Sequence, residues 1–238
     1  MSVEVDETIE GPTRAAPRAR SGKGLWAAAL ASVAVLLLAA FLYAPEDAKQ
    51  GPPQRIFYVH VPSAWIGFLA FFVVFVSSIA FLVTGRRRHD EVAAASAEVG
   101  MVFTTGVLIT GPLWARPIWG VYWSWDPRLT SFLVLWLLYA SYLILRGYVP
   151  DPARRARFSA ILGIVGFLDV PVVYLSVRWW RALHPEQVVF ARGGPRMPAE
   201  MLITLLVGLA AFTLLYLAFV RLRIRVGRLE ERWEEAIA

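Results

Sequence analysis

The stretch from Val61 to Val83 reads VPSAWIGFLAFFVVFVSSIAFLV and contains no charged residue. A helix needs about 20 predominantly apolar residues to cross the hydrocarbon core of a bilayer, which is about 30 Å thick. This stretch is long enough to cross and carries no charge to be buried in lipid. It therefore predicts a membrane-spanning helix.

Five further stretches of similar character occur along the 238-residue chain. Two of them contain a single acidic residue each, Glu98 and Asp169, and the others contain no charge. They are Leu25–Tyr43, Val92–Trp114, Leu129–Leu145, Phe158–Val177 and Met201–Val220. Only 18% of the residues are charged, less than the roughly 25% typical of a soluble domain, and the mean hydropathy is +0.55. We predict an all-α polytopic membrane protein with six transmembrane helices.

The rest of the chain is short, so we expect one integral domain with two tails. Residues 1–24 are rich in Pro, Gly, Arg and Glu and are expected to be a disordered cytoplasmic segment. Residues 25–220 form the predicted six-helix membrane domain. Residues 221–238 are expected to extend the last helix into the cytoplasm.

The distribution of basic residues predicts which side each connection faces. The segments 1–24, 84–91, 146–157 and 221–238 fall on one side of a six-helix arrangement and hold 16 of the 24 lysines and arginines. The positive-inside rule places this side, and with it both termini, in the cytoplasm. This topology accounts for the net charge of +6 without a nucleic-acid partner. The chain has no cysteine, which excludes disulfides, thiolate metal sites and cysteine catalysis.

The chain has three histidines, and two of them fall on the predicted outer side. His60 immediately precedes the second span, and His184 follows the fifth, whereas His89 lies on the cytoplasmic side. If the fold brings these helix ends together, the two imidazoles are suited to be the axial ligands of a haem iron. Zinc is less well matched, because it usually takes three or four His, Cys or carboxylate ligands.

A tryptophan-rich connection lies on the same side, between the third and fourth spans. Residues 112–128 read PLWARPIWGVYWSWDPR and contain the aromatic residues Trp114, Trp119, Tyr122, Trp123 and Trp125. An interfacial aromatic belt explains one or two such rings per helix end. Four tryptophans within twelve residues instead indicate a flat apolar platform, which fits a porphyrin.

Glycines and prolines are frequent in and around this connection and are expected to interrupt the helical geometry. They are Gly111, Pro112, Pro117, Gly120 and Pro127. We therefore expect a short interfacial segment between the third and fourth helices rather than continuous helix.

Arginines on the outer side are candidates to bind the two haem propionates, because a guanidinium can hold a carboxylate through two hydrogen bonds. Arg55 and Arg128 are the first candidates, since they lie nearest the His60 and tryptophan motifs. Asp126 has two possible and compatible roles. It can orient an arginine or a histidine N–H, or it can cap the helix that begins near Pro127.

Three motifs resemble those of the WWD-domain haem-handling superfamily. They are WGVYWSWDPRLTS at 119–131, RIFYVHVPSAW at 55–65 and SVRWWRALHP at 176–185. With six spans and this length, the chain resembles the cytochrome c maturation protein C family, also called haem exporter protein C. The one departure is Tyr122, where the pattern often has another tryptophan.

The resemblance implies a haem-transfer subunit of the bacterial inner membrane rather than an enzyme. Haem b would be bound transiently at the outer face, with His60 and His184 as axial ligands and Trp119–Asp126 holding the ring. The implied partners are a periplasmic haem chaperone, an ABC-type ATPase with its membrane subunit, and a small single-span membrane protein. ATP hydrolysis would belong to the partner, since this sequence has no Walker A pattern.

Three alternatives differ from this reading. A cytochrome c synthase of the same superfamily and a quinone-linked b-type cytochrome both place ligand histidines inside their spans, and no histidine lies inside a span predicted here. In a non-haem transporter, the aromatic residues would only anchor the protein in the interface.

Overall fold

Six helical segments of the computed structural model are long and apolar enough to cross a membrane, as the sequence predicts. The structure describes residues 22–180, 182–184, 189 and 193–237. Within this part every regular element is a helix. These six spans make the chain a multi-pass membrane protein.

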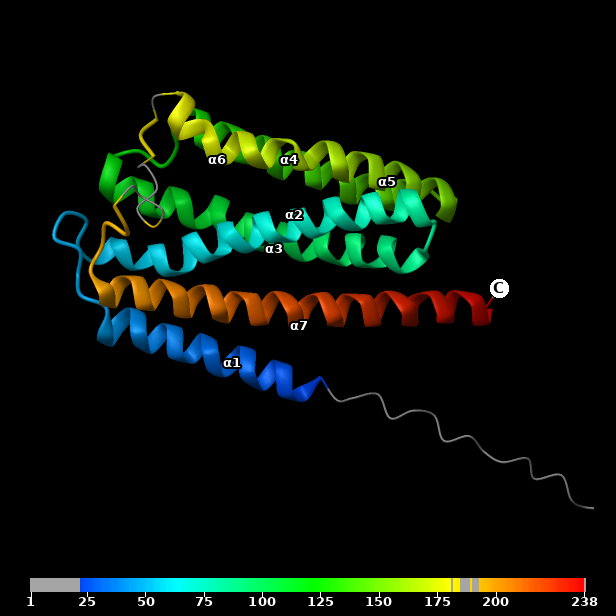
Figure 1. Cartoon of the computed structure of the whole chain (residues 1–238), viewed down its shortest axis with the longest axis horizontal. Helices are drawn as coiled ribbons and strands as arrows, with labels where there is room; N and C mark the ends of the chain where they lie inside the picture. Colours follow the sequence, from blue (N-terminus) through cyan, green and yellow to red (C-terminus); the bar gives the residue numbers. More distant parts are fainter. Residues whose placement is uncertain (1–21, 181, 185–188, 190–192, 238) are drawn as a thin grey trace, which may run out of the picture.

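The elements follow one another along the chain with short connections (Figure 1). In order they are α1 (Lys23–Leu38), the π-helical η1 (Ala39–Tyr43), the 3-10 helix η2 (Pro52–Ile56), α2 (Phe57–Thr84), α3 (Arg87–Trp119), α4 (Pro127–Tyr148), α5 (Pro152–Phe167), α6 (Asp169–Trp179) and α7 (Ala199–Ile237).

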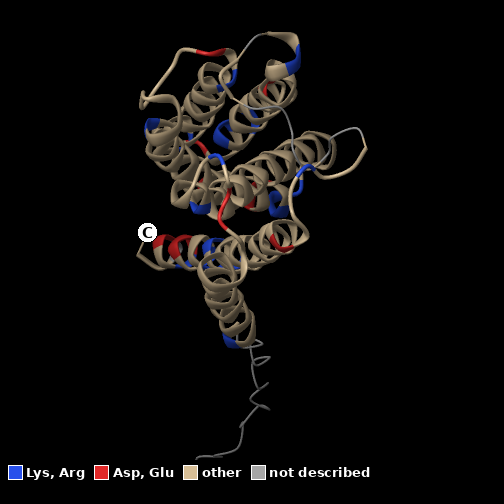
Figure 2. Cartoon of the chain, turned by 90° about the vertical axis from the view of Figure 1, so that its left-hand side faces the viewer, with Lys and Arg blue, Asp and Glu red and all other residues tan. Residues whose placement is uncertain are grey.

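The helices form layers around the central pair α2 and α3 (Figure 1). Helices α4, α5 and α6 cover one side of this pair, and α7 covers the other. Helix α1 packs on α7 and stands away from the remaining helices (Figure 2). Small residues allow α2 and α3 to approach closely. A Cβ atom on Gly100 would lie only 2.8 Å from the ring of Phe71 and 2.9 Å from Ala70.

The connections separate into two sets at opposite ends of the bundle (Figure 1). Those after η1, α3 and α6 lie at one end, which we call the site end. Those after α2 and α4 lie at the other, together with the C-terminus. The predicted grouping of segments into two sides therefore agrees with the fold. That the second end faces the cytoplasm remains a prediction from the charge distribution.

The start of α2 corrects the expectation that His60 precedes the second helix. The helix begins at Phe57, so His60 lies in its first turn. Two prolines at the start of η2 begin the helical path before the apolar run does, because their fixed φ suits the first turn of a helix. Hydropathy alone marks where a span becomes apolar and misses this earlier start.

Helix α3 also corrects the expected interruption at Gly111, Pro112 and Pro117, since it continues through all three to Trp119. A membrane helix tolerates proline because side chains and neighbouring helices satisfy the freed backbone groups. The helix ends at Gly120, whose φ of 78° is the left-handed conformation that glycine adopts readily. Its N–H donates to the Arg116 carbonyl at 3.0 Å.

The fifth span consists of two helices rather than one. Helix α5 ends at Phe167, and α6 begins at Asp169, two residues before Pro171. The missing N–H of that proline removes a helical hydrogen bond at this position. Helix α6 then packs mainly against α4, and Tyr174 on α6 reaches the cavity described below.

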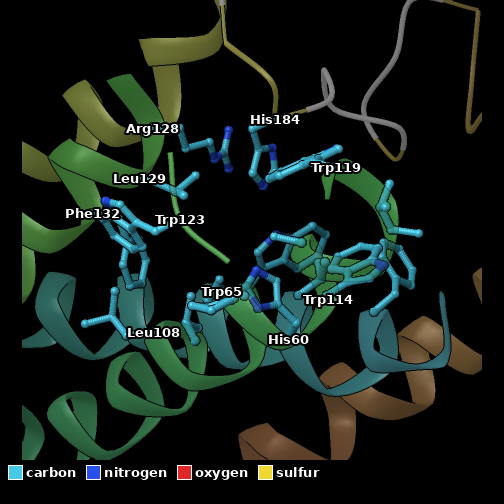
Figure 3. A pocket seen from close by; sticks show the side chains of 18 of the residues that line it. His60, Trp65, Leu108, Trp114, Trp119, Trp123, Arg128, Leu129, Phe132 and His184 are labelled. Atoms are coloured by element: carbon cyan, nitrogen blue, oxygen red, sulfur yellow. The ribbon is translucent and has the colours of Figure 1, made fainter. Parts of the chain in front are cut away.

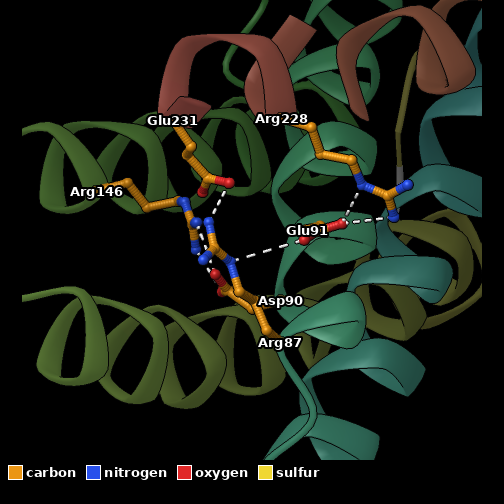
Figure 4. Close-up of polar contacts among 6 residues, drawn as sticks. All are labelled: Arg87, Asp90, Glu91, Arg146, Arg228 and Glu231. Carbon is orange, nitrogen blue, oxygen red and sulfur yellow. Dashed lines mark hydrogen bonds and ion pairs between the residues drawn. The ribbon is translucent and has the colours of Figure 1, made fainter. Parts of the chain in front are cut away.

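The two predicted tails have different outcomes. Residues 1–21 lie outside the described part of the chain, whereas Lys23 and Gly24, expected to be disordered, begin α1. At the other end of the chain, helix α7 continues to Ile237. It contacts the start of α3 through ion pairs, with Arg228 and Glu91 at 2.8 Å and a further pair between Arg87 and Glu231 (Figure 4).

Candidate functional site

A cavity of about 410 Å³ opens at the site end, between α2 and α3 on one side and α4 and α6 on the other. Pockets of this size are typical of small-molecule sites. Most of its lining is apolar or aromatic, and its few polar groups include two histidines and one arginine. The lining residues are Gln50, Phe57, His60, Val61, Ala64, Trp65, Phe68, Val107, Leu108, Gly111, Pro112, Trp114, Ala115, Ile118, Trp119, Trp123, Arg128, Leu129, Phe132, Tyr174, His184 and Val189.

His60 enters the cavity from α2 and is held by α3. Its Nδ1 lies 2.9 Å from the hydroxyl of Thr110. The ring of Trp114 meets the imidazole edge-to-face, with the ring centroids 5.7 Å apart. A Cβ atom on Gly111 would lie 3.3 Å from Cε1 of His60, so this glycine leaves room for the ring. Three residues of one α3 segment therefore determine where the imidazole lies.

His184 enters the same cavity from the opposite side (Figure 3). It lies in the irregular segment that follows α6 and is half-buried. The ring of Trp119 lies edge-on to it, at a centroid distance of 6.3 Å. The fold thus brings to one cavity two histidines that are 124 positions apart in the sequence.

The aromatic walls contain three of the predicted residues and one that sequence reasoning missed. Trp114, Trp119 and Trp123 line the cavity, and the Trp114 indole N–H donates to Oε1 of Gln50 at 2.9 Å. Trp65 on α2 was not anticipated. It follows Val61 by four residues and precedes Phe68 by three, so the helical period of 3.6 residues places Trp65 beside these two other lining residues of α2.

Two predicted aromatic residues lie outside the cavity. Tyr122 is 58% exposed and lies under the guanidinium of Arg116, with 5.6 Å between the guanidinium carbon and the ring centroid. Trp125 is 77% exposed and contacts Trp123 edge-to-face at 5.7 Å. Their exposure places both rings on the surface of the site end.

The two candidate arginines differ in position. Arg128 lines the cavity, and its Nη1 is buried without a hydrogen-bond partner in the described part of the protein. Arg55 lies outside the cavity, donates to the Ala40 carbonyl at the π-helical end of α1, and packs over Phe41. Of the two, only Arg128 is placed to meet a ligand in this cavity.

Asp126 caps α4. One of its carboxylate oxygens accepts from the backbone N–H groups of Arg128 and Leu129, at 3.0 and 2.9 Å. This arrangement confirms the capping role, which satisfies amides left unpaired at a helix start. Asp126 is buried and does not line the cavity.

The residues that line the cavity are of the kinds that a mostly apolar ligand with a metal and an anionic group would need. Two imidazoles from opposite walls are suited to the two axial positions of a haem iron. Buried donors are rarely left unpaired, and two of the residues that line this cavity have one without a partner among the described residues, Arg128 Nη1 and Trp123 Nε1. A ligand carboxylate is an acceptor of the kind that such donors need. Among the described residues, no three His, Cys, Asp or Glu side chains gather as a metal site.

Comparison with known proteins identifies the family of this chain. The family model described as "Heme exporter protein C" matches residues 12–238. The heme exporter protein C of Bradyrhizobium diazoefficiens is 43% identical over 79% of this chain and 73% of its own length. That of Paracoccus denitrificans is 38% identical over 76% of each chain. A putative cytochrome c biosynthesis ccmC-like mitochondrial protein of Marchantia polymorpha is 35% identical over 71% of each. The chain therefore belongs to the heme exporter protein C family.

Proposed function

We propose that this protein binds haem b in the cavity at the site end and holds it there as cargo, on its way to an acceptor. The observation that carries the proposal is the placement of His60 and His184 on opposite walls of one aromatic cavity (Figure 3). Relatives named for haem export and for cytochrome c biosynthesis support haem as the ligand.

Each group in the cavity has a role in this proposal. His60 and His184 are the axial ligands. The indoles of Trp114, Trp119 and Trp123 provide apolar walls for the porphyrin, and Arg128 binds a propionate. Transient binding is supported by the contrast between the ligands, since one is fixed in helix α2 and the other lies in an irregular segment.

We further propose that the acceptor is a periplasmic haem chaperone that docks at the site end. In this scheme the chain is a transfer subunit and not an enzyme. An ABC-type ATPase with its membrane subunit and a small single-span protein complete the assembly. ATP hydrolysis is assigned to the partner because this chain lacks a Walker A sequence. The exposed rings of Tyr122 and Trp125 offer the chaperone an aromatic surface beside the cavity.

The test is to purify the protein from cells that make haem and to record oxidised and reduced absorption spectra. Wild type is expected to show a Soret band with the spectrum of bis-histidine haem. His60→Ala and His184→Ala are expected to lose haem or change its ligation. His89→Ala is the matched control, since His89 lies at the far end of α3. A wild-type protein without a Soret band, or the same spectrum in all variants, would contradict the proposal and favour a non-haem transporter.

A further inference from the structure

The imidazole of His60 has a neighbour that the proposed function does not use. Thr110, on the facing turn of α3, places its hydroxyl oxygen 2.9 Å from Nδ1 of His60. The same hydroxyl lies 2.7 Å from the carbonyl oxygen of Gly106, one turn earlier in α3. The oxygen of Thr110 thus sits between a carbonyl and an imidazole nitrogen.

The direction of these two hydrogen bonds determines the tautomer of His60. A hydroxyl has one hydrogen, and a carbonyl oxygen can only accept, so Thr110 donates to Gly106. Its oxygen is then left to accept, and Nδ1 of His60 must donate. A neutral imidazole has one N–H, so Nε2 keeps a free lone pair.

The neighbours of Thr110 restrict the ring in other directions. Gly111 permits the close approach of Cε1, because any side chain there would press on the imidazole. Trp114 meets the ring edge-to-face, and its own N–H is engaged by Gln50. The ring can therefore neither flip nor slide without losing the Thr110 hydrogen bond or meeting these neighbours.

We propose that Thr110 is a positioning residue, which holds His60 in its Nδ1–H tautomer and so presents Nε2 to the haem iron; this inference rests on the proposed function. Histidine ligands to metals commonly donate their second N–H to such a partner. Threonine is an uncharged acceptor, whereas a carboxylate would make the imidazole more basic and tighten its bond to iron. A hydroxyl orients the ligand without that tightening, which suits a site that must release its haem.

The tautomer is measured without haem, by nitrogen-15 NMR of histidine-labelled protein in detergent. The chain has only three histidines, so His60→Ala identifies the His60 signals. Wild type and Thr110→Ser, which keeps the hydroxyl, are expected to show a protonated Nδ1 and an unprotonated Nε2 at His60. Thr110→Val keeps the branched shape but has no acceptor, and is expected to give a mixture of tautomers. A protonated Nε2 in the wild type, or no change in Thr110→Val, would overturn the inference.

Haemin titration of the same three proteins tests the consequence for binding. Thr110→Val is expected to weaken haemin binding about 10-fold, the lower end of what loss of such a partner costs, and Thr110→Ser to stay within about twofold of wild type. Equal affinity of Thr110→Val and wild type would overturn the positioning role. If His60→Ala binds haemin as wild type does while Thr110→Val still shifts the tautomer, the failure lies in the proposed ligation and not in the tautomer assignment.

Discussion

At the scale of single residues, the cavity contains buried donors that have no acceptor within the described part of the chain. Arg128 Nη1 and Trp123 Nε1 are such donors, and both residues line the same cavity. Leaving a buried donor unpaired costs about 1–3 kcal/mol, and more for a charged group. In the proposed haem complex, a propionate would give such a donor an acceptor and so recover this cost.

Arg128→Ala is expected to weaken haemin binding about 10- to 100-fold, because a hydrogen bond to a charged group contributes about 1.5–3 kcal/mol. Fluorescence quenching of the tryptophans by added haemin measures this affinity. Arg55→Ala is the control and should bind haemin as wild type does, since Arg55 contacts Ala40 and Phe41 outside the cavity.

The dimethyl ester of haemin, which lacks the propionate charges, makes this test specific. If Arg128 binds a propionate, Arg128→Ala should have little effect on the affinity for the ester. An equal loss with haemin and with its ester would show that Arg128 acts on the fold of the cavity and not on the propionate.

At the scale of elements, an aspartate side chain caps the start of α4 and another caps the start of α5. Asp126 caps α4 beside the cavity, and Asp151 caps α5 in the same way at the opposite end, by accepting from the N–H of Arg154 at 2.7 Å. Both carboxylates precede a proline at the first helical position. This pairing of cap and proline begins each helix at a defined residue.

Asp126→Ala is expected to lower the free energy of unfolding by about 1 kcal/mol, the usual cost of losing an N-cap, whereas Asp126→Asn should cost little. Thermal unfolding in detergent measures the difference, and Asp151→Ala serves as a matched cap far from the cavity. If Asp126→Asn keeps stability but loses haemin affinity, the charge of Asp126 has a role in binding beyond the cap.

The ion pairs at the C-terminal end differ in burial (Figure 4). Arg146 binds Asp90 through two hydrogen bonds of 2.6 and 2.9 Å, and both side chains are less than one-fifth exposed. Arg146→Ala leaves that carboxylate buried without its partner and is expected to cost about 3 kcal/mol. Arg87→Ala breaks the pairs with Glu231 and Glu91, in which Arg87 is 60% exposed, and should cost less than about 1 kcal/mol. Equal thermal shifts for the two variants would contradict this difference.

At the scale of the whole molecule, the cavity lies at one end of the bundle and the ion pairs between helices lie at the other. The cavity, both candidate ligands and the exposed aromatic rings lie at the site end, whereas the ion pairs that join α3, α4 and α7 lie at the other. Since α3 and α4 run from one end to the other, each of these two helices carries residues of the cavity at one end and an ion pair at the other (Figure 1).

Cysteine labelling tests the orientation of these two ends, because the chain has no cysteine of its own. Val121→Cys lies at the site end and Thr84→Cys at the opposite end, and both positions are exposed. A membrane-impermeant maleimide is expected to label Val121→Cys in intact spheroplasts, and Thr84→Cys only after lysis. The reverse pattern would place the cavity on the cytoplasmic side.

Most of the fold was predictable because its signals are local. The length of each apolar run determines whether it can span a membrane, and this property needs no knowledge of the neighbouring helices. The ends of helices were less predictable. His60 was expected before α2 and lies within it. The absence of a histidine from the predicted spans, which was the argument against a cytochrome c synthase and a b-type cytochrome, therefore no longer holds. Pro112 and Pro117 were expected to interrupt the helix, but α3 continues through both. In a membrane helix, neighbouring side chains and helices can satisfy the backbone groups that a proline leaves unpaired.

The sequence by itself determined that the chain spans the membrane six times and that His60, His184 and the tryptophans gather at one end. These features follow from hydropathy, from the alternation of sides and from the position of each residue in the chain. Only the tertiary structure decided that Arg128 rather than Arg55 lines the cavity, that Trp65 joins its wall, and that Thr110 faces His60. The reason is that each of these contacts joins different helices, and their packing depends on side-chain shape along the whole interface rather than on any local pattern.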